Sequence, residues 1–208
     1  MKSGFPREKL IHIPTLFNTN TIRKDLNIEY EKFALYIGRI VPEKGVRTLI
    51  DAFINSDYNL KILGFSDDNY ENELKKYIAD KNHKIEFLGR MDFYEIQEYL
   101  SKCLFTIIPS EWYDNLPNTI LESYAFRKCI IATNIGSLSE NVINNESGLL
   151  FEYKNSVDLR NNIEKLFNNP KKAEEMGKNG YQMIKSKYDE ESHYHELINT
   201  FQSIINEK

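Results

Sequence analysis

Short apolar runs alternate with amphipathic segments from residue 33 onward, and this alternation predicts the fold class. The apolar runs are residues 33–37, 60–64, 84–89, 103–108, 129–133 and 148–151. Between them, apolar side chains recur every three to four positions, which is the spacing of a helix with one buried face. Strands that alternate with helices indicate βαβ units. We therefore expect an α/β, Rossmann-like parallel sheet with helices on both faces.

The chain becomes helical after residue 151, and this change sets the expected domain division. Residues 1–32 are mixed and mostly polar, and we expect a lead-in segment that packs on the domain, with residues 10–14 as a possible edge strand. Residues 33–188 form the Rossmann-like domain. Residues 189–208 form a C-terminal amphipathic helix. Its apolar face either packs onto its own domain, which is the default explanation, or turns towards a missing partner.

Composition and charge narrow the function classes. The 208 residues carry a net charge of −4 without a long basic run, so a nucleic acid or an anionic membrane surface is not indicated. No apolar stretch is long enough to span a bilayer, and the start lacks the apolar core of a signal peptide. Cys103 and Cys129 begin apolar runs and have no metal-ligand spacing. We expect a cytoplasmic protein with two buried, reduced cysteines.

The segment from Ser110 to Glu122 is the strongest candidate for chemistry. It joins the buried run at 103–108 to a helix whose first turn we expect to contain Pro117, since proline suits that position. A strand that leads into a helix start presents free backbone N–H groups, which favour a phosphate. Asp114 and Glu122 flank this start and are suited to accepting hydrogen bonds from sugar hydroxyls. The alternative is that Asp114 is a turn residue and Glu122 a solvated helix acid.

The loop after the first predicted strand, residues 37–45, is a second candidate. Gly38 permits a ligand to approach the backbone, and Arg39 and Lys44 bring two positive charges that suit a diphosphate. Two surface cations without a ligand are the alternative. The loop lacks the Gly-Lys-Ser/Thr of a phosphate-binding P-loop, and no G-x-G-x-x-G opens a helix. In an open parallel sheet both candidate segments lie at the carboxyl edge, where ligands bind.

Four motifs in order carry a family resemblance: G-R-I-V-P-E-K-G, F-L-G-R, W-Y-D-N-L-P-N-T-I-L-E and I-A-T-N-I-G-S-L-S-E-N-V. Together they resemble the donor-binding half of the family 4 (group 1) retaining glycosyltransferases, over residues 8 to 205. That family has the two-lobed GT-B architecture. The resemblance covers the second, donor-binding lobe, and it implies that the acceptor-binding first lobe is absent from this chain.

The resemblance assigns roles to particular positions. Arg39 and Lys44 match the cations that bind the donor diphosphate, and Glu122 matches the second acid of the family's E-x7-E pattern, which takes the ribose hydroxyls. Asp114 occupies the place of the first acid, which faces the transferred sugar, although the family has Glu there. Glu140 lies in a further polar loop. The remaining donor-binding positions implied are Gly38, Leu88, Gly89, Asn115, Leu116, Pro117, Asn118 and Thr119.

The implied reaction is transfer of a sugar from a UDP- or GDP-linked donor to a glycan or lipid-linked acceptor, with retention and without a cofactor or metal. The implied setting is bacterial surface-polysaccharide synthesis, peripheral to the inner face of the membrane. We expect this chain alone to bind donor and transfer little. Trp112 either contacts a sugar or packs. Two other functions stay open: a non-catalytic nucleotide-sugar-binding subunit, and another Rossmann-like enzyme such as an epimerase or a dehydrogenase.

Overall fold

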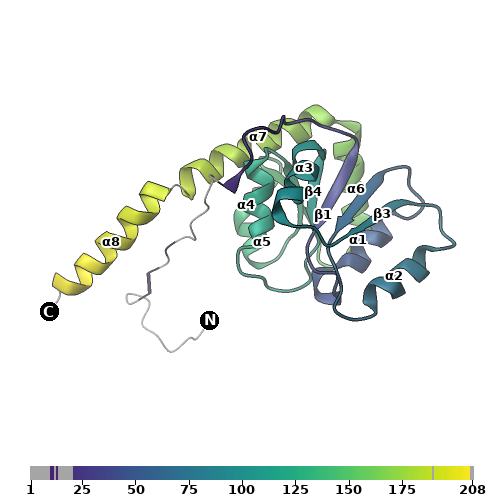
Figure 1. The fold of residues 1–208 in the computed structure, drawn as a ribbon, viewed down its shortest axis with the longest axis horizontal. Coiled ribbons are helices and arrows are strands. Elements are labelled where there is room, and N and C mark those ends of the chain that lie inside the picture. Colours follow the sequence, from purple (N-terminus) through teal and green to yellow (C-terminus); the bar gives the residue numbers. More distant parts are fainter. Residues whose placement is uncertain (1–9, 12, 14–20, 189, 207–208) are drawn as a thin grey trace.

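The computed structural model describes residues 10, 11, 13, 21–188 and 190–206. Its centre is a six-stranded parallel sheet in the order β3-β2-β1-β4-β5-β6 (Figure 1). The strands are β1 (Phe33–Ile37), β2 (Asn59–Leu63), β3 (Lys84–Gly89), β4 (Phe105–Ile108), β5 (Cys129–Thr133) and β6 (Gly148–Phe151). This is the α/β class that the alternating pattern predicts, and all six predicted strands are confirmed.

The helices follow the strands along the chain. They are α1 (Val46–Phe53), α2 (Tyr70–Ile78), α3 (Phe93–Lys102), α4 (Asn118–Ala125), α5 (Gly136–Asn141), α6 (Ser156–Asn168), α7 (Pro170–Lys187) and α8 (Glu190–Asn206), with a short 3-10 helix η3 (Pro42–Lys44) before α1. Two expectations are corrected. The polar segment around Glu140 is the helix α5, and α4 begins one residue after Pro117, which lies at the N-cap.

Both faces of the sheet are covered, as its apolar strands require. On one face, α1, α2 and α6 pack on the sheet around residues such as Leu49, Ile62 and Ile163. On the other face, α4, α5 and α7 pack around Tyr124 and Ile130. The helix α3 packs on β1 and β2. The central strands β4 and β5 are buried along their whole length, whereas the edge strand β3 is partly exposed. We therefore look for the site at the ends of the central strands.

The strand order places the site. The chain runs from β1 outward to β2 and β3, then returns to β4 beside β1 and continues outward to β5 and β6. The direction of winding therefore changes between β1 and β4. The loops that follow these two neighbouring strands diverge to opposite faces of the sheet, and this is where α/β proteins form a ligand crevice.

The N-terminal segment contacts the body along α3. The backbone N–H groups of Glu29 and Glu31 donate to the carbonyls of Ser101 and Lys102 at 2.8 and 2.7 Å. Lys128 is fully buried, donates a hydrogen bond to the Glu29 carbonyl and lies over the ring of Tyr30. Of the possible edge strand at 10–14, residues 10, 11 and 13 are described and are not in a strand, and the others lie outside the described residues.

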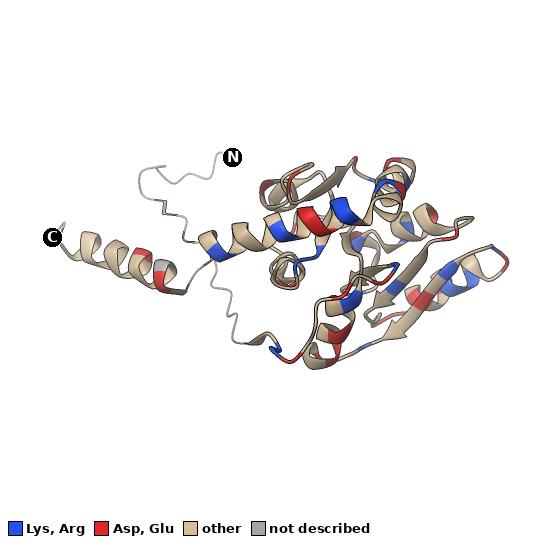
Figure 2. Ribbon diagram, turned by 90° about the horizontal axis from the view of Figure 1, so that it is seen from above, with Lys and Arg blue, Asp and Glu red and all other residues tan. Residues whose placement is uncertain are grey.

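The C-terminal helix α8 extends away from the sheet (Figure 1). The default expectation that its apolar face packs onto its own domain is wrong for Tyr194, Phe201 and Ile205, which are 59%, 54% and 68% exposed. The helix carries acidic residues and no Lys or Arg, as Figure 2 shows. None of the helices in the described residues is both long and apolar enough to cross a membrane.

Candidate functional site

The turn after β1 carries the first cations of the site. Arg39 follows Gly38 at the end of the strand, and its guanidinium lies 3.6 Å from the Glu43 carboxylate. Lys44 ends the 3-10 helix, and Gly45 then turns the chain into α1 with a φ of 67°. A Cβ on Gly45 would lie 1.9 Å from the Pro109 carbonyl oxygen. Only glycine fits this close approach, which holds the turn against the loop after β4.

Lys44 and Asp114 form the central contact of the site. The Lys44 ammonium donates to both carboxylate oxygens of Asp114 at 2.7 Å. The Ser110 hydroxyl donates to Asp114 Oδ2, also at 2.7 Å. The two charged side chains are 24% and 18% exposed, so water screens their attraction only in part. The structure therefore brings together a cation and an acid that the sequence places in two separate motifs.

The start of α4 forms the floor of the same region. Pro117 lies at the N-cap in an extended conformation, and no side chain of the described residues caps this end. The first N–H groups of α4, at Asn118 and Thr119, precede the first hydrogen bond of the helix, which Ile120 donates to the Pro117 carbonyl. Uncapped N–H groups and the helix dipole together favour an anion. This end is the phosphate-compatible feature that the sequence predicts.

A cavity of about 410 Å³ joins these parts. It is lined by Lys44, Trp112, Tyr113, Asp114, Asn115, Leu116 and Pro117. The lining therefore includes the cation of the β1 turn, the first predicted acid and the residues that lead into α4. Four of the predicted donor-binding or catalytic positions between 114 and 117 lie side by side here, and a group attached to a phosphate at α4 would enter the cavity.

Glu122 lies one turn further along α4 and is partly buried. Burial raises the pKa of its carboxyl from 4.5 to about 6. Among the described residues, none donates a hydrogen bond to this carboxylate or forms an ion pair with it. A buried polar group without a partner is costly. Glu122 is therefore available to a ligand that supplies hydroxyl donors.

A smaller cavity of about 210 Å³ lies beyond the ends of β1 and β2. It is lined by Ile37, Gly38, Arg39, Leu63, Gly64, Phe65, Arg90, Met91 and Ile96. Two predicted positions, Gly38 and Arg39, belong to it. Leu88 does not line it and instead packs in the core cluster that contains Leu63 and Leu100. Gly89 has open space around its Cα and a φ of 76°.

Sequence reasoning did not assign Phe65, Arg90 or Met91 to a site. The Arg90 guanidinium lies 4.8 Å from the centre of the Phe65 ring, so these two side chains form one wall of the smaller cavity. Only their position in the sequence could have indicated this role. Each of these residues follows a parallel strand, and such residues meet at the carboxyl edge of the sheet. Phe65 and Met91 belong to no motif, and Arg90 ends the F-L-G-R motif without a role assigned to it.

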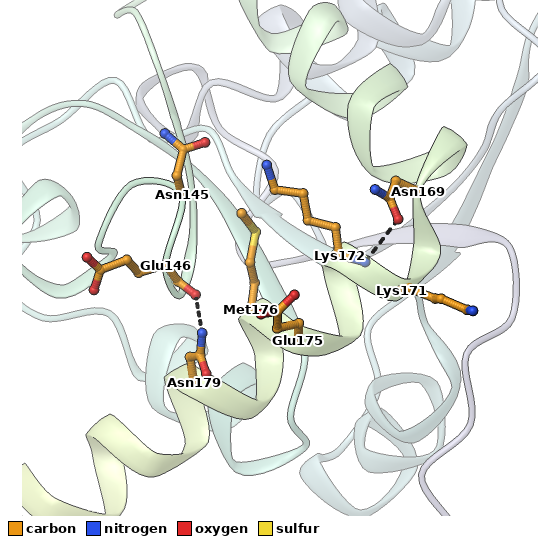
Figure 3. A pocket seen from close by; sticks show the side chains of 8 residues that line it. All are labelled: Asn145, Glu146, Asn169, Lys171, Lys172, Glu175, Met176 and Asn179. Carbon is orange, nitrogen blue, oxygen red and sulfur yellow. Dashed lines mark hydrogen bonds between the residues drawn. The ribbon is translucent and has the colours of Figure 1, made fainter.

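Another cavity, of about 480 Å³, lies between the loop before β6 and the start of α7 (Figure 3). Its lining mixes Lys171 and Lys172 with Glu146 and Glu175, and Asn179 donates a hydrogen bond to the Glu146 carbonyl at 3.0 Å. This cavity lies at the amino ends of the strands, opposite the site described above. None of the predicted site residues lines it.

The comparisons with known proteins agree with this geometry. Residues 18–183 match the family described as glycosyl transferases group 1. An uncharacterized glycosyltransferase of Methanocaldococcus jannaschii is 36% identical over 154 residues, which are 74% of this chain and 43% of that protein. The chain belongs to the group 1 glycosyltransferases.

One further relative and one solved structure are similar to the chain. The capsular polysaccharide biosynthesis glycosyltransferase CapM of Staphylococcus aureus is 25% identical over 178 residues, 83% of this chain and 46% of CapM. The structure of Anabaena HepE in complex with UDP and glucose has a TM-score of 0.75 and 20% identity, and the match covers 83% of this chain and 48% of HepE. The likeness to HepE shows the fold, which is one lobe of a GT-B glycosyltransferase.

The chain spans about half the length of the curated relatives that it matches. It corresponds to the lobe that contains the Lys44–Asp114 contact and the start of α4. In the resemblance that the sequence predicts, Asp114 stands where the family pattern has Glu. The structure shows how this shorter side chain is held, because Lys44 and Ser110 both donate to it.

Proposed function

We propose that this chain binds a UDP- or GDP-linked sugar and is the donor-binding lobe of a retaining hexosyltransferase. One observation carries the proposal: a lysine, an acid and an uncapped helix start converge on a single cavity where the winding of the sheet changes between β1 and β4. A nucleotide-diphosphate sugar has one anionic centre with hydroxyl-rich groups on both sides. A site for such a donor needs cations that bind the diphosphate and acids that accept hydrogen bonds from the hydroxyls.

Different residues of the site bind different parts of the donor. Arg39, Lys44 and the N–H groups at the start of α4 bind the diphosphate. Asp114 accepts a hydrogen bond from the transferred sugar, and Asn115 to Thr119 contact the sugar and the phosphate nearest to it. Glu122, which lacks a partner in the described residues, accepts hydrogen bonds from the ribose hydroxyls. The nucleobase occupies the smaller cavity beyond β1 and β2, which contains Gly38 and lies next to Gly89.

The chemistry follows from the placement of charge. Negative charge grows on the diphosphate as the bond to the sugar breaks, and Arg39, Lys44 and the helix dipole stabilise that charge where it develops. The acceptor hydroxyl attacks the anomeric carbon and gives its proton to the departing diphosphate oxygen, and the new bond retains the anomeric configuration. In this proposal the reaction needs no metal, because the protein itself supplies the positive charge.

The acceptor and the setting extend beyond this chain. A second lobe supplies a glycan or lipid-linked acceptor, since the chain corresponds to only about half of its relatives' length. The named function of CapM supports a setting in bacterial surface-polysaccharide synthesis. We expect the complete protein to work in the cytoplasm at the inner face of the membrane. A non-catalytic nucleotide-sugar-binding subunit is the second candidate, and the same half-length match favours it.

A panel of ligands tests the proposal. The thermal midpoint of unfolding is measured with UDP, GDP, UDP-sugars and NAD. A ligand at about 100 times its dissociation constant stabilises the folded state by roughly 2.7 kcal/mol, which shifts the midpoint by several degrees. We expect a shift with UDP or GDP and with the corresponding sugar nucleotide. A shift with NAD alone would contradict the proposal.

A further inference from the structure

Two aromatic side chains next to the donor site are largely exposed. Trp112 and Tyr113 are 63% and 77% exposed, and both line the cavity of about 410 Å³ that contains Lys44 and Asp114. Large aromatic rings on a protein surface forgo the free energy that burial would give. Two adjacent rings at the rim of a binding cavity therefore call for a ligand, whereas scattered exposed apolar residues do not.

The loop that carries these rings is held from three sides. The Glu111 N–H donates to the Glu43 carbonyl at 2.8 Å, and the Thr48 hydroxyl donates to the Glu111 carboxylate at 2.6 Å. The Ser137 hydroxyl donates to the Asp114 carbonyl at 2.9 Å. These bonds anchor the residues before and after the rings to η3, α1 and α5. The two rings are consequently presented on a fixed backbone.

The Tyr113 ring has a defined position. It lies against Gly136, where an added Cβ would be 3.0 Å from Tyr113 Cδ1. The absence of a side chain on Gly136, which has a φ of 46°, makes room for the ring. Tyr113 nevertheless remains 77% exposed, so this contact orients the ring and leaves most of its surface to a ligand.

The inner wall of the cavity is already assigned to the donor. A diphosphate at Lys44 and the start of α4 places the transferred sugar at Asp114, which is 2.7 Å from Lys44. Trp112 and Tyr113 line the same cavity and are far more exposed than the Asp114 side chain, which is 18% exposed, so they lie nearer to the solvent. Resting on the proposed function, we propose that Trp112 and Tyr113 bind a pyranose ring of the acceptor glycan.

An aromatic side chain and a pyranose ring have complementary surfaces. One face of a pyranose ring presents C–H groups and is apolar, while its hydroxyls point outward from the ring edge. An aromatic face packs against the C–H face, and the side chains beside it accept or donate to the hydroxyls. Asn115, which lines the same cavity, supplies polar groups beside the two rings. Trp112 and Tyr113 are flanked in the sequence by Glu111 and Asp114. Two exposed aromatic side chains are a much smaller surface than the roughly 800 Å² per partner of a stable protein interface, and they suit one sugar ring.

Trp112 gives the test a built-in signal, because it is the one tryptophan in the sequence. The full chain is saturated with UDP, as verified by calorimetry, and titrated with the methyl α-glycosides of glucose, galactose, N-acetylglucosamine and N-acetylgalactosamine. Trp112 emission and saturation-transfer NMR are recorded. We expect at least one glycoside to shift the emission to shorter wavelength and to receive saturation on its C–H face.

Variants test whether the two aromatic rings themselves bind the glycoside. Trp112→Ala and Tyr113→Ala should each weaken glycoside binding in the NMR titration by about tenfold and leave UDP affinity within about twofold of the native value. Tyr194→Ala is the matched control, because Tyr194 is 59% exposed and lies on α8, away from the site. This control should bind the glycosides and UDP like the native chain.

The outcomes distinguish this inference from the proposed function. If neither UDP nor GDP binds, the proposed function fails and the inference fails with it. If UDP binds and no glycoside alters Trp112 emission, or if both alanine variants bind glycosides normally, only the inference is overturned. If UDP-glucose or UDP-galactose alters the emission and free glycosides do not, the rings contact the transferred sugar and the assignment to the acceptor is wrong.

Discussion

Lys44 and Asp114 lie far apart in the sequence, yet the Lys44 ammonium contacts both carboxylate oxygens of Asp114 at 2.7 Å. The charge of the lysine is thus balanced by the acid that we assign to the transferred sugar. Under the proposed function, a diphosphate that binds Lys44 competes with the Asp114 carboxylate for the charge of this lysine. We expect donor binding to weaken the contact between Lys44 and Asp114 and to free the Asp114 carboxylate for the sugar.

This competition predicts that Asp114→Asn strengthens UDP binding. The substitution removes a negative charge that holds Lys44 and repels phosphate, and we expect tighter binding by about 1 kcal/mol, or roughly fivefold. Titration calorimetry with UDP measures the effect. Asp57→Asn, which makes the same charge change at a side chain that is 90% exposed, is the control. Unchanged or weaker UDP binding by Asp114→Asn would show that the carboxylate does not compete.

The raised pKa of Glu122 predicts how Glu122→Gln changes stability. Burial raises this pKa from 4.5 to about 6, so between these values the folded state binds more protons than the unfolded state. Stability then falls as pH rises through this window, and the ionised group destabilises the fold above it. Glu122→Gln should therefore add about 1–2 kcal/mol at about pH 7.5 and make little difference near pH 4. Urea unfolding at the two pH values measures this, and equal stabilities at about pH 7.5 would contradict it.

The same pKa predicts the pH dependence of donor binding. Protonation of Glu122 below about pH 6 removes charge from the carboxylate oxygens that we propose as acceptors of hydrogen bonds from the ribose hydroxyls. UDP-glucose affinity should therefore decrease as pH is lowered from about 7.5 to 5, and the profile should be flatter in Glu122→Gln. UDP-glucose is preferred to UDP because its diphosphate has no terminal group that titrates in this range. A parallel decrease in the native chain and the variant would remove Glu122 from the site.

Two glycines with similar backbones test the packing of the β1 turn. Gly45 and Gly89 have φ values of 67° and 76°, but an added Cβ would meet the Pro109 carbonyl oxygen at 1.9 Å only at Gly45. Gly45→Ala combines strain with this clash, and we expect a loss of more than about 2 kcal/mol. Gly89→Ala has strain alone and should lose about 1 kcal/mol. Chemical denaturation of both variants measures the difference, and equal losses would contradict the close approach.

The central strands were predictable because they are continuous apolar runs, as at 129–133, while β2 and β3 alternate apolar residues with charged ones. The short helix α5 was missed since its polar sequence, with Glu140 exposed, shows little helical periodicity. Phe65 and Met91 were missed as cavity residues because their role depends on which strands are neighbours. That order is set by the packing of whole helices on the sheet, and no local pattern encodes it.

The candidate site was predictable as two separate motifs, and its central contact was not. Arg39, Lys44 and Asp114 are recognisable from residue type and position after a strand. Their relative placement follows from β1 and β4 being neighbours and from the fit of Gly45 against Pro109. The sequence also did not decide what the apolar face of α8 packs against, and this face is exposed in the structure. An amphipathic pattern shows that a face is apolar and does not show what covers it.

The most direct test of the diphosphate site is titration calorimetry of UDP and GDP with the double variant Arg39→Ala, Lys44→Ala. The control is Lys75→Ala, Lys178→Ala, which removes two cations from ion pairs on α2 and α7. Loss of two charge-assisted contacts should weaken nucleotide binding by about 100-fold or more, while the control binds like the native chain and both variants remain folded. Native affinity in the Arg39 and Lys44 double variant would contradict the proposed site.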